Sequence, residues 1–147
     1  MTHTYPRRTN YQAPADLMQA LIPHMAEAGR GWIVNLTSGA VRPAEGPPFE
    51  VAMEIGLYGA TKAALNRLTN AMGASLYGSG IRVNAVMPRA AVLSEGADAL
   101  VGDVLRPEQV EPMESIVEAI LVLCECEPER TAKVYVSLDL LAELGAP

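Results

Sequence analysis

Tyr58-Gly59-Ala60-Thr61-Lys62 stands twenty residues after Ser38, the last residue of the run Ile33-Val34-Asn35-Leu36-Thr37-Ser38. The run predicts a buried strand, and the segment that carries Tyr58 and Lys62 predicts a helix. Residues four apart in a helix share one face, and an ammonium beside a phenol favours the phenolate. Such a phenol can exchange a proton with a hydroxyl or a carbonyl, and a serine that ends the preceding strand can donate to the same oxygen. The trio suits interconversion of an alcohol and a ketone, whereas the alternative is that Tyr58 and Lys62 are ordinary helix residues.

Helical and strand patterns alternate outward from this pair. We expect helices over Ala15–Ala28, Gly59–Leu76 and Pro112–Cys126, strands over Trp32–Leu36, Ile81–Val86 and Lys133–Leu138, a long loop over Thr37–Leu57, and a loop or short helix over Ala90–Pro107. Alternation of this kind implies a parallel sheet with helices on its faces. A chain of 147 residues is long enough to bury one core, so we expect a single α/β domain over residues 1–147.

Composition excludes several classes of partner. The net charge is −6, which argues against nucleic acid and against an anionic membrane surface. The apolar runs are far shorter than the roughly 20 residues of a membrane span. The first eight residues carry two arginines with no apolar stretch after them, which is not the pattern of a secretory signal. We therefore expect a cytoplasmic protein.

The two cysteines give no sign of a metal site. Cys124 and Cys126 are two residues apart in a helical pattern, so they point to different sides of that helix. His3 and His24 are remote from them in sequence, and zinc needs more ligands than two thiols. We expect no bound metal and two reduced thiols.

Three motifs in order carry a resemblance to a known family: Gly31-Trp32-Ile33-Val34-Asn35-Leu36-Thr37-Ser38-Gly39, then Tyr58-Gly59-Ala60-Thr61-Lys62-Ala63-Ala64-Leu65, then Gly80-Ile81-Arg82-Val83-Asn84-Ala85-Val86-Met87-Pro88. Together they resemble the short-chain dehydrogenase/reductase family, over about Asn10 to Leu144. The resemblance implies a partial Rossmann-like fold whose three parallel strands are the family's fifth to seventh. The family's first strand and its glycine-rich pyrophosphate turn, Thr-Gly-x-x-x-Gly-x-Gly, have no counterpart in this sequence. We therefore expect the chain to be the C-terminal catalytic half of the domain.

The resemblance also implies a reaction and its catalytic residues. The reaction is hydride transfer between NAD or NADP and a secondary alcohol or ketone. The residues that select between the two cofactors belong to the N-terminal half of the family's domain, which has no counterpart in this sequence. Ser38 would polarise the substrate oxygen, Tyr58 would be the acid/base, and Lys62 would favour its phenolate and bind the nicotinamide ribose. Asn10 would complete a tetrad by supporting a proton-relay water. Its alternative role is that of a helix cap.

Further cofactor contacts follow from the third motif. Pro88 matches the proline of a family turn whose backbone follows the nicotinamide, although Arg89 stands where the family has glycine. Val92 and Ser94 match the family valine and threonine near the carboxamide and the phosphates. Arg89 would place a positive charge near a phosphate or an acidic substrate, or would be solvated as most loop arginines are.

The loop between the first strand and the central helix is apolar. Its apolar character comes from Pro47, Pro48, Phe49, Met53, Ile55 and Leu57. They predict either a hydrophobic substrate beneath the loop or packing of the loop onto the domain.

The part of the family's fold that has no counterpart in this sequence affects both how the chain assembles and whether it is active. The strand at Ile33–Leu36 would be an unpaired edge, to be covered by a second copy or by a complementing N-terminal half. In the family the helices that match Ala15–Ala28 and Gly59–Leu76 often pack on their copies, which would place Ala64 and Ala71 near an interface. Without the glycine-rich turn, the chain alone should bind dinucleotide weakly. The alternative to an enzyme is a truncated, non-catalytic remnant that acts as a structural or oligomerisation module, or as a small-molecule binder.

Overall fold

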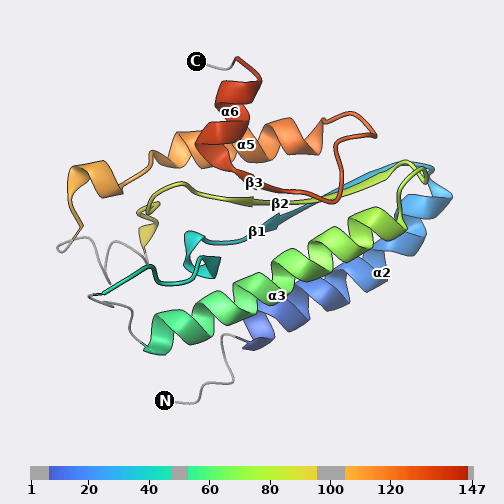
Figure 1. The fold of residues 1–147 in the computed structure, drawn as a ribbon. Coiled ribbons are helices and arrows are strands. Elements are labelled where there is room, and N and C mark those ends of the chain that lie inside the picture. Colours follow the sequence, from blue (N-terminus) through green and yellow to red (C-terminus); the bar gives the residue numbers. More distant parts are fainter. Residues whose placement is uncertain (1–6, 48–52, 96–104, 146–147) are drawn as a thin grey trace.

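A computed structural model of the chain describes residues 7–47, 53–95 and 105–145, and in this part the elements form three layers. A parallel sheet lies between the helices α2 and α3 on one face and α5 and α6 on the other (Figure 1). The helices are η1 Arg8–Gln12, α2 Ala13–Glu27, η2 Gly39–Val41, α3 Met53–Ser75, η4 Pro107–Gln109, α5 Met113–Cys124 and α6 Ser137–Glu143; the strands are β1 Gly31–Leu36, β2 Ile81–Met87 and β3 Val134–Val136. The expected α/β fold with three parallel strands and flanking helices is confirmed.

The sheet has the order β1-β2-β3. β1 pairs over its whole length with β2, from Gly31 opposite Ile81 to Leu36 opposite Val86. β3 joins only the last part of β2, with Ala85 opposite Val134. Within the described residues β1 therefore has a partner on one side only, which makes it the edge expected from the sequence.

The core on the α2 and α3 face combines apolar packing with one buried polar contact. Met18, Ile81 and Val83 are buried there. The Asn35 side-chain amide donates to the Thr69 hydroxyl at 2.9 Å, and that hydroxyl donates to the carbonyl of Leu65 at 2.8 Å. Because buried polar groups are costly without partners, this pair restricts how α3 can sit on β1.

The core on the α5 and α6 face is larger. Its buried members are Val86, Ile116, Ala119, Leu123, Tyr135, Leu140 and Leu141. In α5 the apolar residues recur every three or four positions, so one stripe of the helix faces the sheet. Leu140 and Leu141 bring α6 onto the same cluster and close it at the β3 edge.

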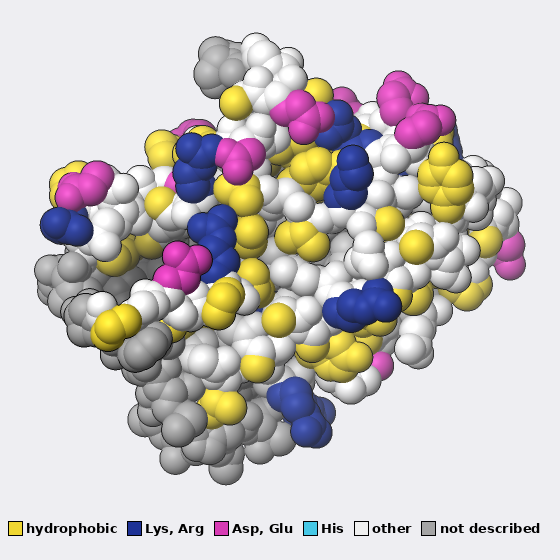
Figure 2. Space-filling view, viewed as in Figure 1, with side chains coloured by type: hydrophobic (Ala, Val, Ile, Leu, Met, Phe, Trp, Pro, Cys, Tyr) yellow, Lys and Arg dark blue, Asp and Glu magenta, His cyan; other side chains and the backbone are white. Residues whose placement is uncertain are grey.

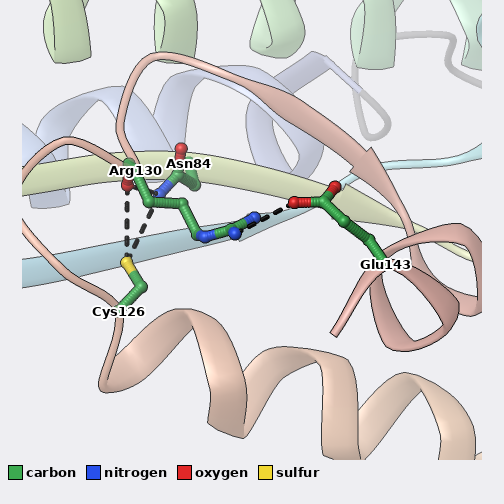
Figure 3. Close-up of polar contacts among 4 residues, drawn as sticks. All are labelled: Asn84, Cys126, Arg130 and Glu143. Carbon is green, nitrogen blue, oxygen red and sulfur yellow. Dashed lines mark hydrogen bonds and ion pairs between the residues drawn. The ribbon is translucent and has the colours of Figure 1, made fainter. Parts of the chain in front are cut away.

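A polar cluster joins the segment after α5 to β2 and to α6 (Figure 3). The carbonyl of Arg130 accepts from the Asn84 side-chain amide at 2.7 Å and from the Cys126 thiol at 3.4 Å. The guanidinium of Arg130 extends away to Glu143 of α6, 3.0 Å from its carboxylate (Figure 3). Burial raises the pKa of the Cys126 thiol, so this cysteine is a structural hydrogen-bonding group rather than a ready nucleophile.

The structure departs from the sequence-based expectation in three places. The helix expected over Pro112–Cys126 ends at Cys124, so Cys126 lies beyond it. The helix expected from Gly59 begins at Met53, so the last part of the segment expected to be loop, Met53–Leu57, is helical. The strand expected over Lys133–Leu138 is only Val134–Val136, and α6 follows it directly. Ser137, Leu140 and Leu141 have helical spacing and are buried, so packing on α5 favours a helix over further strand. Pro48, Phe49 and residues 96–104 lie outside the described residues.

Within the described residues no helix is long and apolar enough to cross a membrane. In the same part of the chain, no three His, Cys, Asp or Glu side chains are grouped so that they could hold a metal ion. Cys124 is exposed, Cys126 is buried, and both thiols are free.

Two glycines of α3 should respond oppositely to alanine. At Gly73 an added Cβ would lie 2.6 Å from the backbone of Ala132 and 2.8 Å from the carbonyl oxygen of Val83, whereas at Gly56 it would meet no atom within 4 Å. Gly73→Ala should lower the free energy of unfolding by about 1–3 kcal/mol through overpacking. Gly56→Ala should raise it by up to about 1 kcal/mol through helix propensity. Urea unfolding of both variants measures the difference, and equal effects would contradict the close packing at Gly73.

Candidate active site

The carboxyl ends of β1 and β2 lie side by side at one end of the sheet, and in open parallel sheets ligand sites form outside these strand ends. The Thr37 N–H continues the pairing beyond β1 and donates to the Val86 carbonyl at 2.8 Å. Ser38 follows directly, and at Gly39 the nearest atom to an added Cβ would be the Pro88 carbonyl oxygen, 4.0 Å away. Ser38 and the turn at Pro88, far apart in sequence, are therefore neighbours.

Lys62 reaches back from α3 to the end of β1. Its ammonium donates to the Leu36 carbonyl at 2.8 Å and lies 5.8 Å from the centre of the Tyr58 ring. Burial lowers the pKa of Lys62 below its ordinary value of 10.5, because a half-buried ammonium loses part of its hydration. Tyr58 and Lys62 thus share one face of α3, as their spacing predicts.

Close packing joins this part of α3 to the segment after β1. The Thr37 hydroxyl donates to the Lys62 carbonyl at 3.5 Å. Gly59 is buried against the Ala40 carbonyl, and any Cβ at this position would collide with that oxygen. The glycine next to Tyr58 therefore lets η2, and Ser38 before it, approach the helix.

The hydroxyl of Ser38 accepts from the Ala40 N–H at 3.2 Å and caps η2. A hydroxyl that accepts one hydrogen bond can still donate its own proton. Tyr58 has 36% of its surface exposed. Both oxygens can therefore serve a ligand.

Asn10 lies in η1 and contacts the same turn of α3. Its side-chain amide donates to the Thr61 hydroxyl at 3.3 Å, and Thr61 donates to the Tyr58 carbonyl at 2.7 Å. Asn10 sits inside a continuous helical segment, where it makes a tertiary contact instead of a cap. The structure thus brings Asn10, Tyr58, Lys62 and the end of β1 together.

Of the four residues expected to contact a cofactor after β2, Pro88 lies at the site, whereas Arg89, Val92 and Ser94 make other contacts. Pro88 is half-buried beside Gly39, at the site. Arg89 is exposed and its guanidinium forms an ion pair with Asp139 of α6. Val92 packs against the α5 core, and Ser94 is exposed, with its N–H donating to the Val92 carbonyl at 3.0 Å.

Sequence reasoning missed Glu111. Its side chain is 2% exposed, and it accepts from the backbone N–H groups of Arg89 and Ala90 at 2.7 and 3.4 Å and from the Ser137 hydroxyl. A glutamate between Val110 and Pro112 has no motif around it. Only the folded arrangement shows that its carboxylate is surrounded by donors.

An apolar hollow of about 390 Å³ flanks the site between η2 and α3. Its lining includes Val41, Pro43, Ile55, Ala60 and Ala63. Ile55, one of the apolar residues of the segment after Ser38, thus faces a cavity.

Comparison with known protein families gives one match that covers most of the chain. A model of the family described as short chain dehydrogenase matches residues 7–102. Among curated proteins, the oxidoreductase asL5 of Sarocladium schorii is 34% identical over 95 residues, which are 65% of this chain and 35% of that protein.

Solved structures resemble the fold over nearly its whole length. A 3-oxoacyl-[acyl-carrier protein] reductase from Brucella melitensis with bound NAD is 28% identical with a TM-score of 0.69, and 92% of this chain covers 51% of it. A gluconate 5-dehydrogenase from Burkholderia cenocepacia in complex with NADP and tartrate is 25% identical with a TM-score of 0.73, and 92% of this chain covers 54% of it. The chain thus spans about half the length of these structures.

The two lysines of the chain, Lys62 and Lys133, allow a direct test of the site's electrostatics. With ¹³C-labelled lysine, the Lys62 Cε resonance should titrate with a midpoint below 10.5, and Lys62→Arg should remove that resonance. Between the lowered pKa and 10.5 the unfolded chain binds more protons than the folded chain. The Lys62 contribution therefore makes folding more favourable as pH rises through this window, and Lys62→Met should abolish that part of the pH dependence. A Lys62 midpoint at or above 10.5 would contradict the burial of its ammonium.

Proposed function

Because this chain belongs to the short-chain dehydrogenase family, we propose that it carries the catalytic residues for hydride transfer between NAD or NADP and a secondary alcohol or ketone. We further propose that it corresponds to the C-terminal half of the family's domain. Its three strands would then be the fifth to seventh of the family's complete sheet, and another of the family's strands would pair with β1.

One observation carries the proposal: the Lys62 ammonium is held at the end of β1, 5.8 Å from the centre of the Tyr58 ring, on the carbonyl of Leu36, two residues before Ser38. A cation so placed stabilises a phenolate, and a serine hydroxyl at the same edge can bind the substrate oxygen. An ordinary helix pair would not require the glycine contact with Ala40 that brings the serine segment against α3.

The residues take defined roles in the reduction direction. The Ser38 hydroxyl donates to the carbonyl oxygen and orients it. The Tyr58 hydroxyl gives its proton to that oxygen, and Lys62 stabilises the phenolate that remains. The bound dinucleotide supplies the hydride. Asn10, through Thr61, supports the turn that carries Tyr58, and we propose it as the fourth member of the set.

The residues present suit the nicotinamide end of the cofactor. The Lys62 ammonium has three donors and uses one on Leu36, which leaves two for the ribose hydroxyls. Pro88 places the turn after β2 beside this position. Gly78 and Gly80 have positive φ angles but precede β2, at the opposite end of the sheet, so they are not a pyrophosphate turn. The fit therefore supports either dinucleotide at its nicotinamide end.

The hollow beside η2 favours one class of substrate. Its lining is apolar except for Arg42, and it includes Gly59, the neighbour of Tyr58, and Ala63, the neighbour of Lys62. We propose that the apolar part of an alcohol or ketone substrate occupies it. The same hollow also supports the second candidate function, binding of an apolar small molecule without catalysis.

Catalysis can be tested by completing the domain. We would fuse this chain to the N-terminal half of the Brucella melitensis 3-oxoacyl-[acyl-carrier protein] reductase and measure NADH- and NADPH-dependent reduction of a panel of ketones. Tyr58→Phe should lower turnover by about 100- to 10,000-fold, the usual contribution of a general acid–base group. Tyr77→Phe, at a tyrosine 67% exposed, is the matched control and should keep full activity. A folded chimera that binds dinucleotide but turns over no ketone, or a fully active Tyr58→Phe variant, would refute the assignment.

The outer surface of α2 and α3 is suited to self-association, and we propose a two-fold interface there. Leu17 and Leu21 are 60% and 46% exposed, and Ala64 and Ala71 are exposed small residues that permit close helix contact. Figure 2 shows the contrast on one face of the molecule: charged side chains of both signs gather over α5 and α6, and fewer charged side chains lie over α3. Apolar surface of this kind is typical of protein interfaces.

Ala64→Arg should dissociate the oligomer, because it places a long charged side chain in the proposed contact. Ala142→Arg adds the same charge at an exposed alanine of α6 and should leave the assembly unchanged. Sedimentation velocity at micromolar concentration measures both variants. A compact monomer for the unchanged chain would rule out this interface.

A further inference from the structure

Glu111 is a buried carboxylate that joins three separate segments. It stands between η4 and α5, and only 2% of its surface is exposed. One carboxylate oxygen accepts from the N–H groups of Arg89 and Ala90, at 2.7 and 3.4 Å, and the other accepts from the hydroxyl of Ser137. Ser137 is itself fully buried at the start of α6.

No salt bridge neutralises this carboxylate among the described residues. Its charge is held by backbone and hydroxyl donors, and such charge-assisted hydrogen bonds are roughly twice as strong as neutral ones. Loss of this carboxylate would leave the N–H groups of Arg89 and Ala90 and the hydroxyl of Ser137 without their acceptor, which is costly for buried groups. The carboxylate therefore holds these three donors in place.

The backbone around Glu111 reinforces the same connection. The Ala91 N–H donates to the Gln109 carbonyl at 2.8 Å, and the Glu111 N–H donates to the Ala91 carbonyl at 2.7 Å. The ion pair between Arg89 and Asp139 joins the loop to α6 from its exposed side. The loop after β2 is therefore held on both sides, by the buried carboxylate of Glu111 and by the exposed ion pair of Arg89 with Asp139.

We propose that Glu111 is a positioning residue for the nicotinamide end of the cofactor. It acts through the Arg89 and Ala90 amides, and so sets the path of the backbone that follows Pro88. The inference rests on the proposed function, because it assumes that this turn faces the nicotinamide. Glu111 itself touches no reacting group.

The test uses the full chain and reduced nicotinamide mononucleotide, which lacks the adenosine half of the dinucleotide. Amide hydrogen exchange by ¹⁵N NMR reports on the loop, and shift changes at Ser38, Tyr58 and residues 89–92 report on ligand binding. The variants are Glu111→Gln, which keeps a neutral acceptor, and Glu111→Leu, which keeps bulk alone. Glu118→Gln, at an exposed glutamate of α5, is the control for loss of charge.

Arg89 exchange should speed up by about 3- to 10-fold in Glu111→Gln, because a charge-assisted bond becomes a neutral one. The increase should be larger in Glu111→Leu. The Thr37 amide, which donates to Val86, should keep its exchange rate in both. The dissociation constant for the mononucleotide should rise several-fold in the Glu111 variants and stay unchanged in Glu118→Gln. If Glu111→Leu does not fold, Glu111→Gln decides the result alone.

The outcomes separate this inference from the proposed function. Unchanged Arg89 exchange in Glu111→Gln overturns the inference, as does faster exchange with an unchanged dissociation constant. Absence of any shift at Ser38, Tyr58 or residues 89–92 in the unchanged chain, at millimolar mononucleotide, overturns the proposed nicotinamide site and the inference with it.

Discussion

The hydrogen bond from the Lys62 ammonium to the Leu36 carbonyl is the contact on which the candidate site depends. It ties a charged group of α3 to the last residue of β1 at 2.8 Å, in a half-buried place where an ammonium needs a partner. Because Tyr58 is one turn away and Ser38 is two residues beyond Leu36, this bond places all three functional groups relative to one another. The absent side chain at Gly59 makes the same approach sterically possible.

Much of this arrangement follows from local rules of sequence. The spacing of Tyr58 and Lys62 and the apolar runs of β1 and β2 each predict one element, and the order of the elements predicts a parallel sheet. These features were predictable because each depends on residues adjacent along the chain or one helical turn apart. The contact of Asn10 with Thr61 is different, because it links residues fifty-one positions apart and depends on how two helices pack.

The features that the sequence did not predict depend on tertiary packing. The segment Val134–Leu138 has strand character, yet the chain turns into α6 at Ser137, and Leu140 and Leu141 of this helix are buried in the cluster with α5. The start of α3 at Met53 places Ile55 on the hollow beside η2. Glu111 is the clearest case, since its donors come from the loop after β2 and from the start of α6.

The unpaired edge of β1 also restricts which polypeptide strand can pair with it. Along this strand Ile33 and Asn35 face the α2 and α3 layer, and Val34 faces the α5 layer, so both faces of the sheet are occupied up to its edge. A polypeptide that adds here must present apolar side chains in both directions, as central parallel strands do. A shift by a single residue would exchange its two faces, so the alignment of a complementary strand must keep each of its side chains on the core that it fits.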